Sequence, residues 1–201
     1  MGVSHILSYN KKEMDNDFVY HASKNRGLKI IKPRESTHKQ RWVYATKDII
    51  TSAMFLGNNS DFICQTGVEN GKPCIYEQFK GALEHAYAGQ QGSIYKVDGK
   101  NFKSDQTSWS AEVVSDKAQV VLEEIKIEDS LKFLLKLEKE DKLKIYKYPN
   151  KPPHAPKDKG DIIKKAVQWT FDFGESTLDQ VKKYHPDVLP EVLKRLKNIR
   201  K

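Results

Sequence analysis

Three short segments of the chain contain side chains suited to chemistry on a sugar or a flat ring. His21 ends a predicted strand, Tyr44 lies on a second strand that runs into a helix, and Glu112 interrupts an apolar strand. A carboxylate can stabilise the positive charge that develops when a glycosidic bond breaks, most effectively in a dry, preorganised site. Aromatic side chains can stack on a flat ligand ring. The three segments are therefore candidates for one common site.

Each of these residues also has a purely structural interpretation. His21 could be a hydrogen-bonded strand histidine, and Tyr44 and Phe55 could be core aromatics. Glu112 could be an exposed residue of an edge strand, although Trp109 and other apolar residues flank it. The order and spacing of the segments, rather than any one residue, favour a ligand site.

The spacing of residues within these segments indicates which class of reaction they could support. Ser52 follows Tyr44 by eight positions and Phe55 follows it by eleven. Glu112 is followed by two valines and, three residues later, by Ala-Gln-Val at 118–120. In this pattern the chain resembles the ADP-ribosyltransferase superfamily, in the His-Tyr-Glu branch that poly(ADP-ribose) polymerases and diphtheria toxin typify.

The resemblance covers roughly residues 18–148 and implies that NAD⁺ is the substrate, cleaved at its nicotinamide–ribose bond. In the family, the glutamate acts on the ribose, the histidine orients ribose hydroxyls, two aromatic rings stack on nicotinamide and a serine binds its carboxamide. The catalytic residues that it implies are Glu112, His21 and Tyr44, and the NAD-binding residues are His21, Ala22, Ser23, Tyr44, Ser52 and Phe55.

An arginine is a further candidate for the NAD⁺ site, because a guanidinium can bind a pyrophosphate through two parallel hydrogen bonds. Arg34 and Arg41 both lie between the histidine and tyrosine segments. The spacing does not distinguish them, and both stay candidates.

Two departures from the family pattern shape the functional hypothesis. Ser110 stands where arginine-modifying transferases have Glu or Gln, which disfavours arginine as the acceptor. Ala22 replaces the family's glycine, which leaves open a catalytically inactive module that binds nucleotide or nucleic acid. We expect a mono-ADP-ribosyltransferase or an NAD⁺ glycohydrolase, and the acceptor can be a protein, a nucleic acid or a small molecule.

The elements that carry these segments indicate an α+β domain. Short β-branched and aromatic runs recur over the first 149 residues without regular alternation with helices. Asp48 is expected to cap a short helix, a second helix is predicted from Phe79 to Tyr87, and a third begins at Asp129 or Ser130. Together with the resemblance, this predicts an ADP-ribosyltransferase-like fold with split mixed or antiparallel sheets and short helices.

The sequence changes character at Pro149. Four prolines between 149 and 156 predict an extended strap, because proline supports neither helix interiors nor strand ladders. We expect an ADP-ribosyltransferase-like domain over residues 1–149 and a helical extension over 150–201 that packs on it. Three helical patterns follow the strap, at residues 161–169, at 178–184 and from Pro186 or Pro190 onward.

The expected extension is basic. Residues 150–201 carry 12 Lys and Arg against 7 Asp and Glu, a net charge of +5 out of the +8 of the whole chain. Such a surface can contact nucleic-acid phosphates. The lysines are interspersed with acidic residues, however, so a solvated helical face is the alternative.

Composition excludes several classes of protein. The 38% hydrophobic content suffices for one core, but the longest apolar runs are a few residues, against the roughly 20 that span a bilayer. The N-terminus lacks the apolar region of a secretory signal. Cys64 and Cys74 fit neither a disulfide framework nor a zinc or redox motif. We expect a cytoplasmic protein with buried thiols, no metal and no membrane partner.

Overall fold

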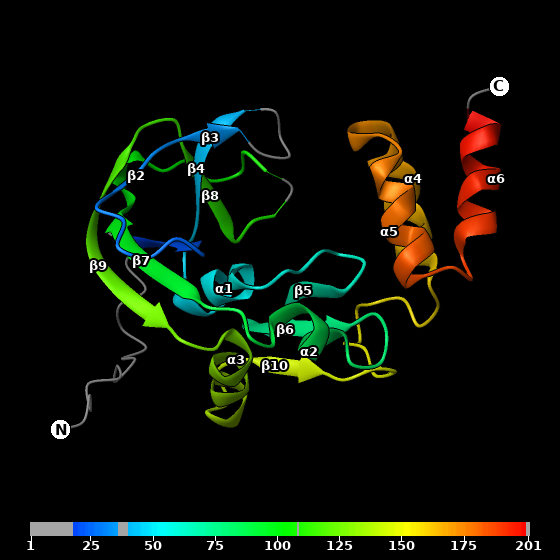
Figure 1. Cartoon of the computed structure of the whole chain (residues 1–201), viewed down its shortest axis with the longest axis horizontal. Coiled ribbons are helices and arrows are strands. Elements are labelled where there is room, and N and C mark those ends of the chain that lie inside the picture. Colours follow the sequence, from blue (N-terminus) through cyan, green and yellow to red (C-terminus); the bar gives the residue numbers. More distant parts are fainter. Residues whose placement is uncertain (1–17, 36–39, 108, 200–201) are drawn as a thin grey trace.

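The computed structural model describes residues 18–35, 40–107 and 109–199. This part of the chain forms an α+β structure with two β-sheets and six short α-helices (Figure 1). The α+β class predicted from the sequence is confirmed. None of the described helices is both long and apolar enough to cross a membrane.

The larger sheet has seven strands and is antiparallel throughout. Its strand order is β2-β9-β7-β1-β4-β3, and β8 pairs with β4 as well. The sheet curls strongly, as Figure 1 shows. Its strands are β1 (Phe18–Ser23), β2 (Ile30–Ile31), β3 (Arg34–Glu35), β4 (Arg41–Thr46), β7 (Gly92–Asp98), β8 (Glu112–Ser115) and β9 (Gln119–Ile127).

The junction between β1 and β4 is the sparsest in this sheet. Six residues of β1 pair with β7, whereas the described register between β1 and β4 consists of the single pair Tyr20 and Thr46. On the other side of β4, Thr46 is also opposite Glu112 of β8. The sheet thus consists of two well-paired halves that meet at one register position.

The smaller sheet has three strands in the order β10-β6-β5. The hairpin of β5 (Cys64–Glu69) and β6 (Lys72–Glu77) turns at Asn70 and Gly71, which both have positive φ angles, as a tight hairpin turn requires. β10 (Lys144–Tyr146) adds to β6 in parallel. β5 was not among the predicted strands, because its sequence is largely polar and small.

Three helices and two 3₁₀ turns pack around the sheets. They are α1 (Ile49–Ala53), η1 (Met54–Leu56), α2 (Ala82–Tyr87), η2 (Gly99–Asn101) and α3 (Ser130–Lys139). The predicted cap at Asp48 is confirmed, since its carboxylate accepts the Thr51 N–H at 2.7 Å. Of the two predicted start residues of α3, Asp129 is the cap, and its carboxylate accepts the Lys132 N–H at 2.9 Å.

The two faces of the curled sheet contact different apolar clusters. Tyr20 and Ala22 of β1 pack on the larger cluster, which contains residues of α1, α2 and α3. Val19 and its neighbours on β4, β7 and β8 form a second cluster, as the alternation of side chains along a strand requires. Cys64 and Cys74 are buried free thiols, as expected.

The proline-rich segment is more folded than an extended strap. The Asn150 N–H donates to the Lys147 carbonyl and the Ala155 N–H donates to the Pro152 carbonyl, each at 2.9 Å, so the chain makes two turns. Pro152 is buried. The expectation of a purely extended strap was therefore wrong, because proline's fixed φ suits turns as well as extended chain.

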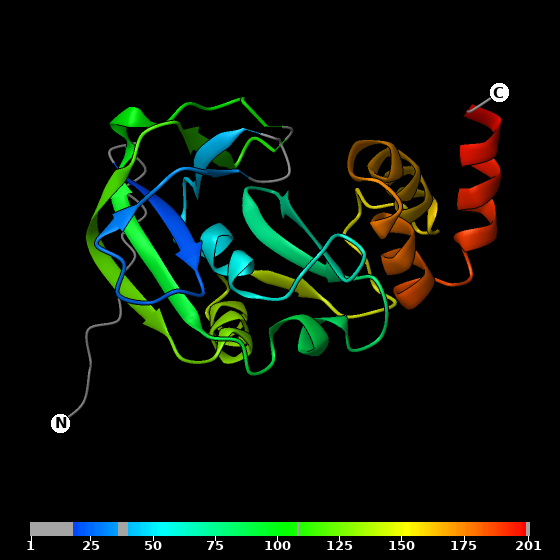
Figure 2. The same ribbon diagram turned by 45° about the horizontal axis from the view of Figure 1, so that its top comes forward.

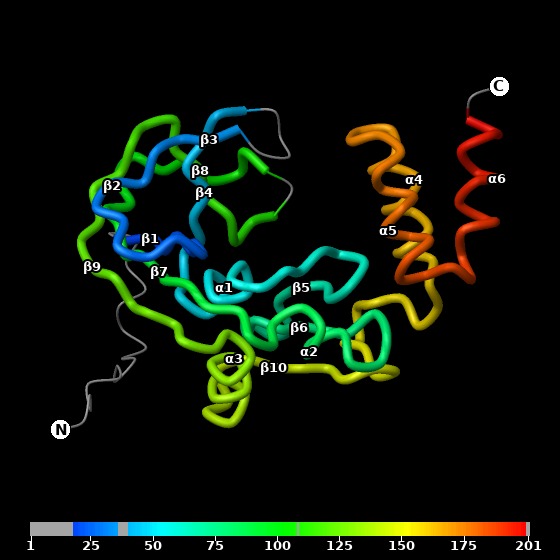
Figure 3. Tube along the Cα trace, viewed as in Figure 1, coloured from blue at the N-terminus to red at the C-terminus, as the bar shows by residue number. Residues whose placement is uncertain are grey.

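The last three helices, α4 (Gly160–Phe173), α5 (Ser176–Tyr184) and α6 (Leu189–Ile199), form what we call the C-terminal helical unit. Figures 2 and 3 show the unit at the opposite end of the molecule from the curled sheet, with the smaller sheet between them. Its apolar core contains Phe62, which comes from the segment before β5. The unit is thereby joined to the α+β body, meaning β1 to β10 with α1 to α3.

A buried carboxylate links α2 to the proline-rich segment. Glu77, at the end of β6, is only 2% exposed. It accepts the N–H of Leu83 at 2.8 Å and the N–H of Tyr148 at 2.9 Å, and the Lys147 ammonium lies 3.9 Å away. Glu77 therefore satisfies an N–H of the first turn of α2, which has no side-chain cap of its own.

We predict that Glu77→Ala lowers the free energy of unfolding by about 2–4 kcal/mol, because it leaves two N–H groups without their buried acceptor. Urea denaturation followed by circular dichroism measures the change. Glu84→Ala is the matched control: this exposed carboxylate contacts the same lysine at 2.6 Å, and its loss should cost less than about 1 kcal/mol. Equal destabilisation by both variants would contradict the role of Glu77.

Candidate functional site

The fold brings the three sequence segments onto neighbouring strands. His21 lies on β1, Tyr44 on β4 and Glu112 at the start of β8, and the order of these strands in the sheet is β1-β4-β8. Tyr20, Thr46 and Glu112 occupy one register position across the three strands. With neighbouring strands about 4.8 Å apart, the backbones of Tyr20 and Glu112 are separated by roughly 10 Å.

His21 connects β1 to β4 where their backbone pairing ends. Its Nδ1 lies 2.7 Å from the carbonyl oxygen of Tyr44. Because a carbonyl only accepts, Nδ1 carries the proton, and Nε2 of the neutral ring remains an acceptor. The pKa of His21 is lowered, first by burial and also by the positive charge of Arg34, while the bond to Tyr44 opposes the shift. His21 is therefore a neutral imidazole with its orientation fixed.

The action of Arg34 on His21 separates the two candidate arginines. Arg34 lies on β3 opposite Trp42, and its charge acts on His21. Arg41 begins β4, is exposed and pairs in register with Glu35. Arg34 is thus the arginine that lies within electrostatic reach of the histidine.

Helix α1 holds the junction between β1 and β4 from one side. The hydroxyl of Ser52 donates to the carbonyl of Tyr20 at 3.3 Å, and the hydroxyl of Thr46 donates to the carbonyl of Asp48 at 2.8 Å. Ser52 and Thr46 are both almost completely buried, at 1% and 2% exposed. The predicted ligand-binding serine therefore lies at the junction and already has a backbone partner.

An aromatic pair lies next to Glu112. The rings of Phe55 and Trp109 are 5.7 Å apart, and Phe55 is 49% exposed. The backbone N–H of Glu112 donates to the carbonyl of Trp109 at 3.0 Å. Tyr44 makes a separate edge-to-face contact with Trp42, at 6.0 Å. Phe55 and Tyr44, predicted as two faces of one sandwich, thus each pack against a different tryptophan.

Ala22 and Ser23 contribute differently from the other predicted residues. The Ala22 side chain packs against the larger apolar cluster. The Ser23 hydroxyl accepts the N–H of Asn25 at 3.2 Å, within the loop that follows β1. The methyl group of Ala22 is thus partly covered by protein.

Sequence reasoning did not assign a role to three residues at this site: Trp42, Thr46 and Trp109. A signal existed for Trp109, because a large aromatic residue three positions before Glu112 flanks the predicted carboxylate. Thr46 lies two positions after Tyr44, but only strand pairing shows that it separates Tyr20 from Glu112. Within the described ranges, no group of three or more His, Cys, Asp and Glu side chains could hold a metal ion.

Comparison with known proteins identifies no relative: no family model, no curated protein and no solved structure matches this chain. The interpretation of the site therefore depends on its own geometry and on the residue pattern in the sequence.

The electrostatic contact between Arg34 and His21 can be measured by NMR titration of the histidine ring. We predict a pKa below 6.5 for His21 in the folded protein. Arg34→Gln should raise it, because the repulsion between two positive charges is removed, but not fully to 6.5, since burial remains. Arg41→Gln is the control and should leave the pKa of His21 unchanged. An equal response to both variants would contradict the assignment of Arg34.

The same shift makes the stability of the protein depend on pH. Because the pKa of His21 is lower in the folded state, the unfolded state binds more protons between that pKa and about 6.5. His21 therefore causes the free energy of unfolding to fall as the pH drops through this range. In urea denaturation between pH 7.5 and 5, the free energy of unfolding of His21→Gln should depend less steeply on pH than that of the wild type. An unchanged slope would contradict the assigned contribution of His21.

Proposed function

We propose that this protein cleaves the nicotinamide–ribose bond of NAD⁺, either transferring one ADP-ribose to an acceptor or hydrolysing NAD⁺. The observation that carries the proposal is the β1-β4-β8 arrangement, in which three segments that are distant in sequence become neighbours. Glu112 lies across Thr46 from the residue that precedes His21. We further propose an ADP-ribosyltransferase-like fold for the α+β body, supported by the sparse junction between the halves of the larger sheet.

The proposed reaction is a substitution at the anomeric carbon of the ribose attached to nicotinamide. The C–N bond breaks and nicotinamide leaves with the bonding electron pair as a neutral molecule, while the ribose acquires oxocarbenium character. A nucleophilic oxygen or nitrogen of the acceptor, or of water, then bonds to that carbon and loses a proton to solvent. Glu112 stabilises the positive charge in the transition state.

The other residues of the site would bind and orient NAD⁺. His21 is neutral with Nε2 as an acceptor, so it can accept a hydrogen bond from a ribose hydroxyl. Arg34 would bind the pyrophosphate. Tyr44, Ser52 and Phe55 would contact nicotinamide, and the exposed ring of Phe55 next to Trp109 offers a stacking surface.

The experiment that tests the proposal measures nicotinamide release from NAD⁺ by the purified full chain. Glu112→Gln removes the negative charge but keeps the size of the side chain, so we predict at least about a 100-fold loss of kcat. The KM for NAD⁺ should change little, because the lost interaction is strongest in the transition state. Glu123→Gln, an exposed carboxylate on β9, is the control and should keep wild-type rates.

Equal nicotinamide release by wild type and Glu112→Gln would overturn the proposal. If the wild type releases none, calorimetry with NAD⁺ decides: saturable binding keeps the transferase proposal, and absence of binding removes it. The remaining interpretation would then be a non-catalytic module that uses its basic C-terminal residues. Ion pairs neutralise part of this positive charge, since Lys159 pairs with Asp187 and Arg195 pairs with Glu191, each at 2.8 Å.

A further inference from the structure

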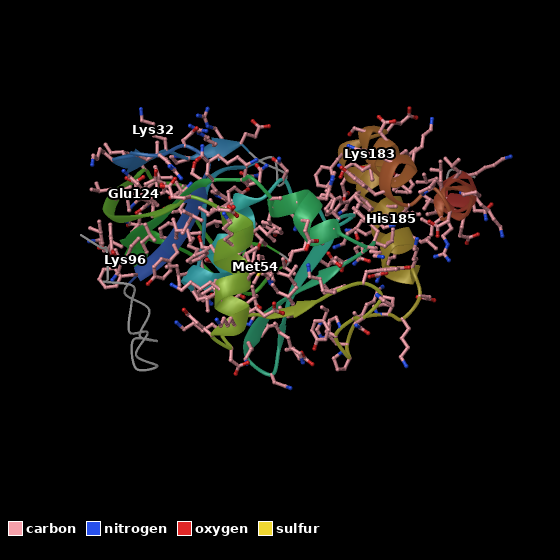
Figure 4. All side chains as sticks on the ribbon, turned by 60° about the horizontal axis from the view of Figure 1, so that its bottom comes forward. Lys32, Met54, Lys96, Glu124, Lys183 and His185 are labelled. Carbon is pink, nitrogen blue, oxygen red and sulfur yellow. The ribbon has the colours of Figure 1, made fainter. Side chains whose placement is uncertain are left out.

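One buried histidine lies at the contact between the C-terminal helical unit and the α+β body. His185 is the C-cap residue directly after α5 and is 0% exposed. Figure 4 labels it among the C-terminal helices. Its Nε2 lies 2.7 Å from the carbonyl oxygen of Phe62, so Nε2 carries the proton and donates. The other nitrogen, Nδ1, is buried and has no hydrogen-bond partner among the described residues.

Aromatic rings from both parts surround this hydrogen bond. Phe79 of the body stacks on Tyr184 of α5 at 5.6 Å and meets the His185 ring edge-on at 6.2 Å. Phe62 of the body packs edge-to-face on Trp169 of α4 at 5.5 Å. Aromatic rings therefore surround the His185 to Phe62 bond, and a Gln65 to Asp161 hydrogen bond and a Lys165 to Asp61 ion pair also join the two parts.

Charged groups around His185 come mainly from the helical unit. Lys159 and Asp161, at the start of α4, and Asp187, just after α5, all act on it electrostatically. Lys159 binds Asp187 and holds the pKa of that carboxyl low. The body contributes the Phe62 carbonyl and the Phe79 ring. The pKa of His185 is lowered, chiefly by burial.

A second imidazole lies at the edge of the same contact. The ring of His85 in α2 is 6.1 Å from that of Phe79, and its Nε2 lies 3.3 Å from the hydroxyl of Tyr184. His85 is exposed. It is therefore an imidazole that contacts the same Phe79 ring but lacks the burial of His185.

We propose that His185 is an acid-sensitive clamp that holds the C-terminal helical unit on the α+β body while neutral and releases it when protonated. Protonation adds a hydrogen to Nδ1, which creates a buried cation with a donor that has no acceptor. Detachment lets the ring reach water, where the charged form is stable. The clamp is independent of the proposed NAD⁺ chemistry, since it involves none of the residues assigned to that site.

The direction of the pH effect follows from linkage. In the detached unit the pKa of His185 is ordinary, about 6.5, whereas in the attached unit it is lower. The detached state therefore binds more protons between these two values. The equilibrium constant for attachment should fall by up to about tenfold for each pH unit between 6.5 and the lower pKa of the attached state, and should change little above 6.5.

The test is an NMR titration of the full chain from pH 7.5 to 5, following backbone amides and the indole of Trp169. In the wild type we expect the resonances of α4, α5 and α6 to change and the Trp169 indole to lose the ring-current effect of Phe62, while β7 and β9 keep their native resonances. The midpoint of this change should coincide with the titration of the His185 ring.

Two variants separate the clamp from general acid destabilisation. His185→Gln keeps an N–H donor for the Phe62 carbonyl but does not titrate, so the unit should stay attached at pH 5. His85→Gln should keep the wild-type response. The clamp is overturned if the wild-type unit stays attached at pH 5, or if His185→Gln detaches with the wild-type midpoint. If His185→Gln does not fold, a wild-type release midpoint that differs from the His185 titration overturns it instead.

Discussion

The structure of the α+β body depends on the junction between β1 and β4. The larger sheet is divided there into one half with β2, β9, β7 and β1 and another with β4, β8 and β3, and one register pair joins them. Side chains complete what the backbone does not: His21 bonds to the Tyr44 carbonyl and Ser52 bonds to the Tyr20 carbonyl. Helix α1 supports both strands, so its cap at Asp48 also matters for the junction.

Several candidate site residues therefore support the junction in addition to their proposed contacts with a ligand. His21 links two strands and is held neutral by burial, and Ser52 and Thr46 are buried and bonded to backbone carbonyls. Substitutions at these positions therefore alter the packing of the junction as well as the binding of any ligand. Glu112 begins its strand and is only half-buried, so its charge can be removed with less disturbance of the fold. That difference makes Glu112 the most informative position for testing chemistry.

The C-terminal helical unit is attached by a different kind of contact. The halves of the sheet are joined by strand pairing and by side-chain bonds to backbone carbonyls, whereas the unit contacts the body through the rings of Phe62 and Phe79 and through His185. Gln65 adds a hydrogen bond to Asp161, and Lys165 pairs with Asp61. No strand among the described residues crosses this contact, so its opening would not require the sheet to unfold.

Features that depend on residues close together in the chain could be predicted from the sequence. The cap at Asp48, the helix that begins at Asp129 or Ser130 and the three C-terminal helices follow from local hydrogen bonding and apolar periodicity. The presence of α+β structure also followed, as did the likeness of the three segments to one family's pattern.

Contacts between residues that are distant in the chain could not be predicted, because they depend on the tertiary fold. The fold placed Arg34 rather than Arg41 near His21 and Trp109 against Phe55. The polar segment of β5 forms a strand because it pairs with β6. His185 bonds to the Phe62 carbonyl, although the two residues are 123 positions apart in the sequence. These outcomes depend on strand partners, register and burial, which the whole chain selects together and which no local propensity contains.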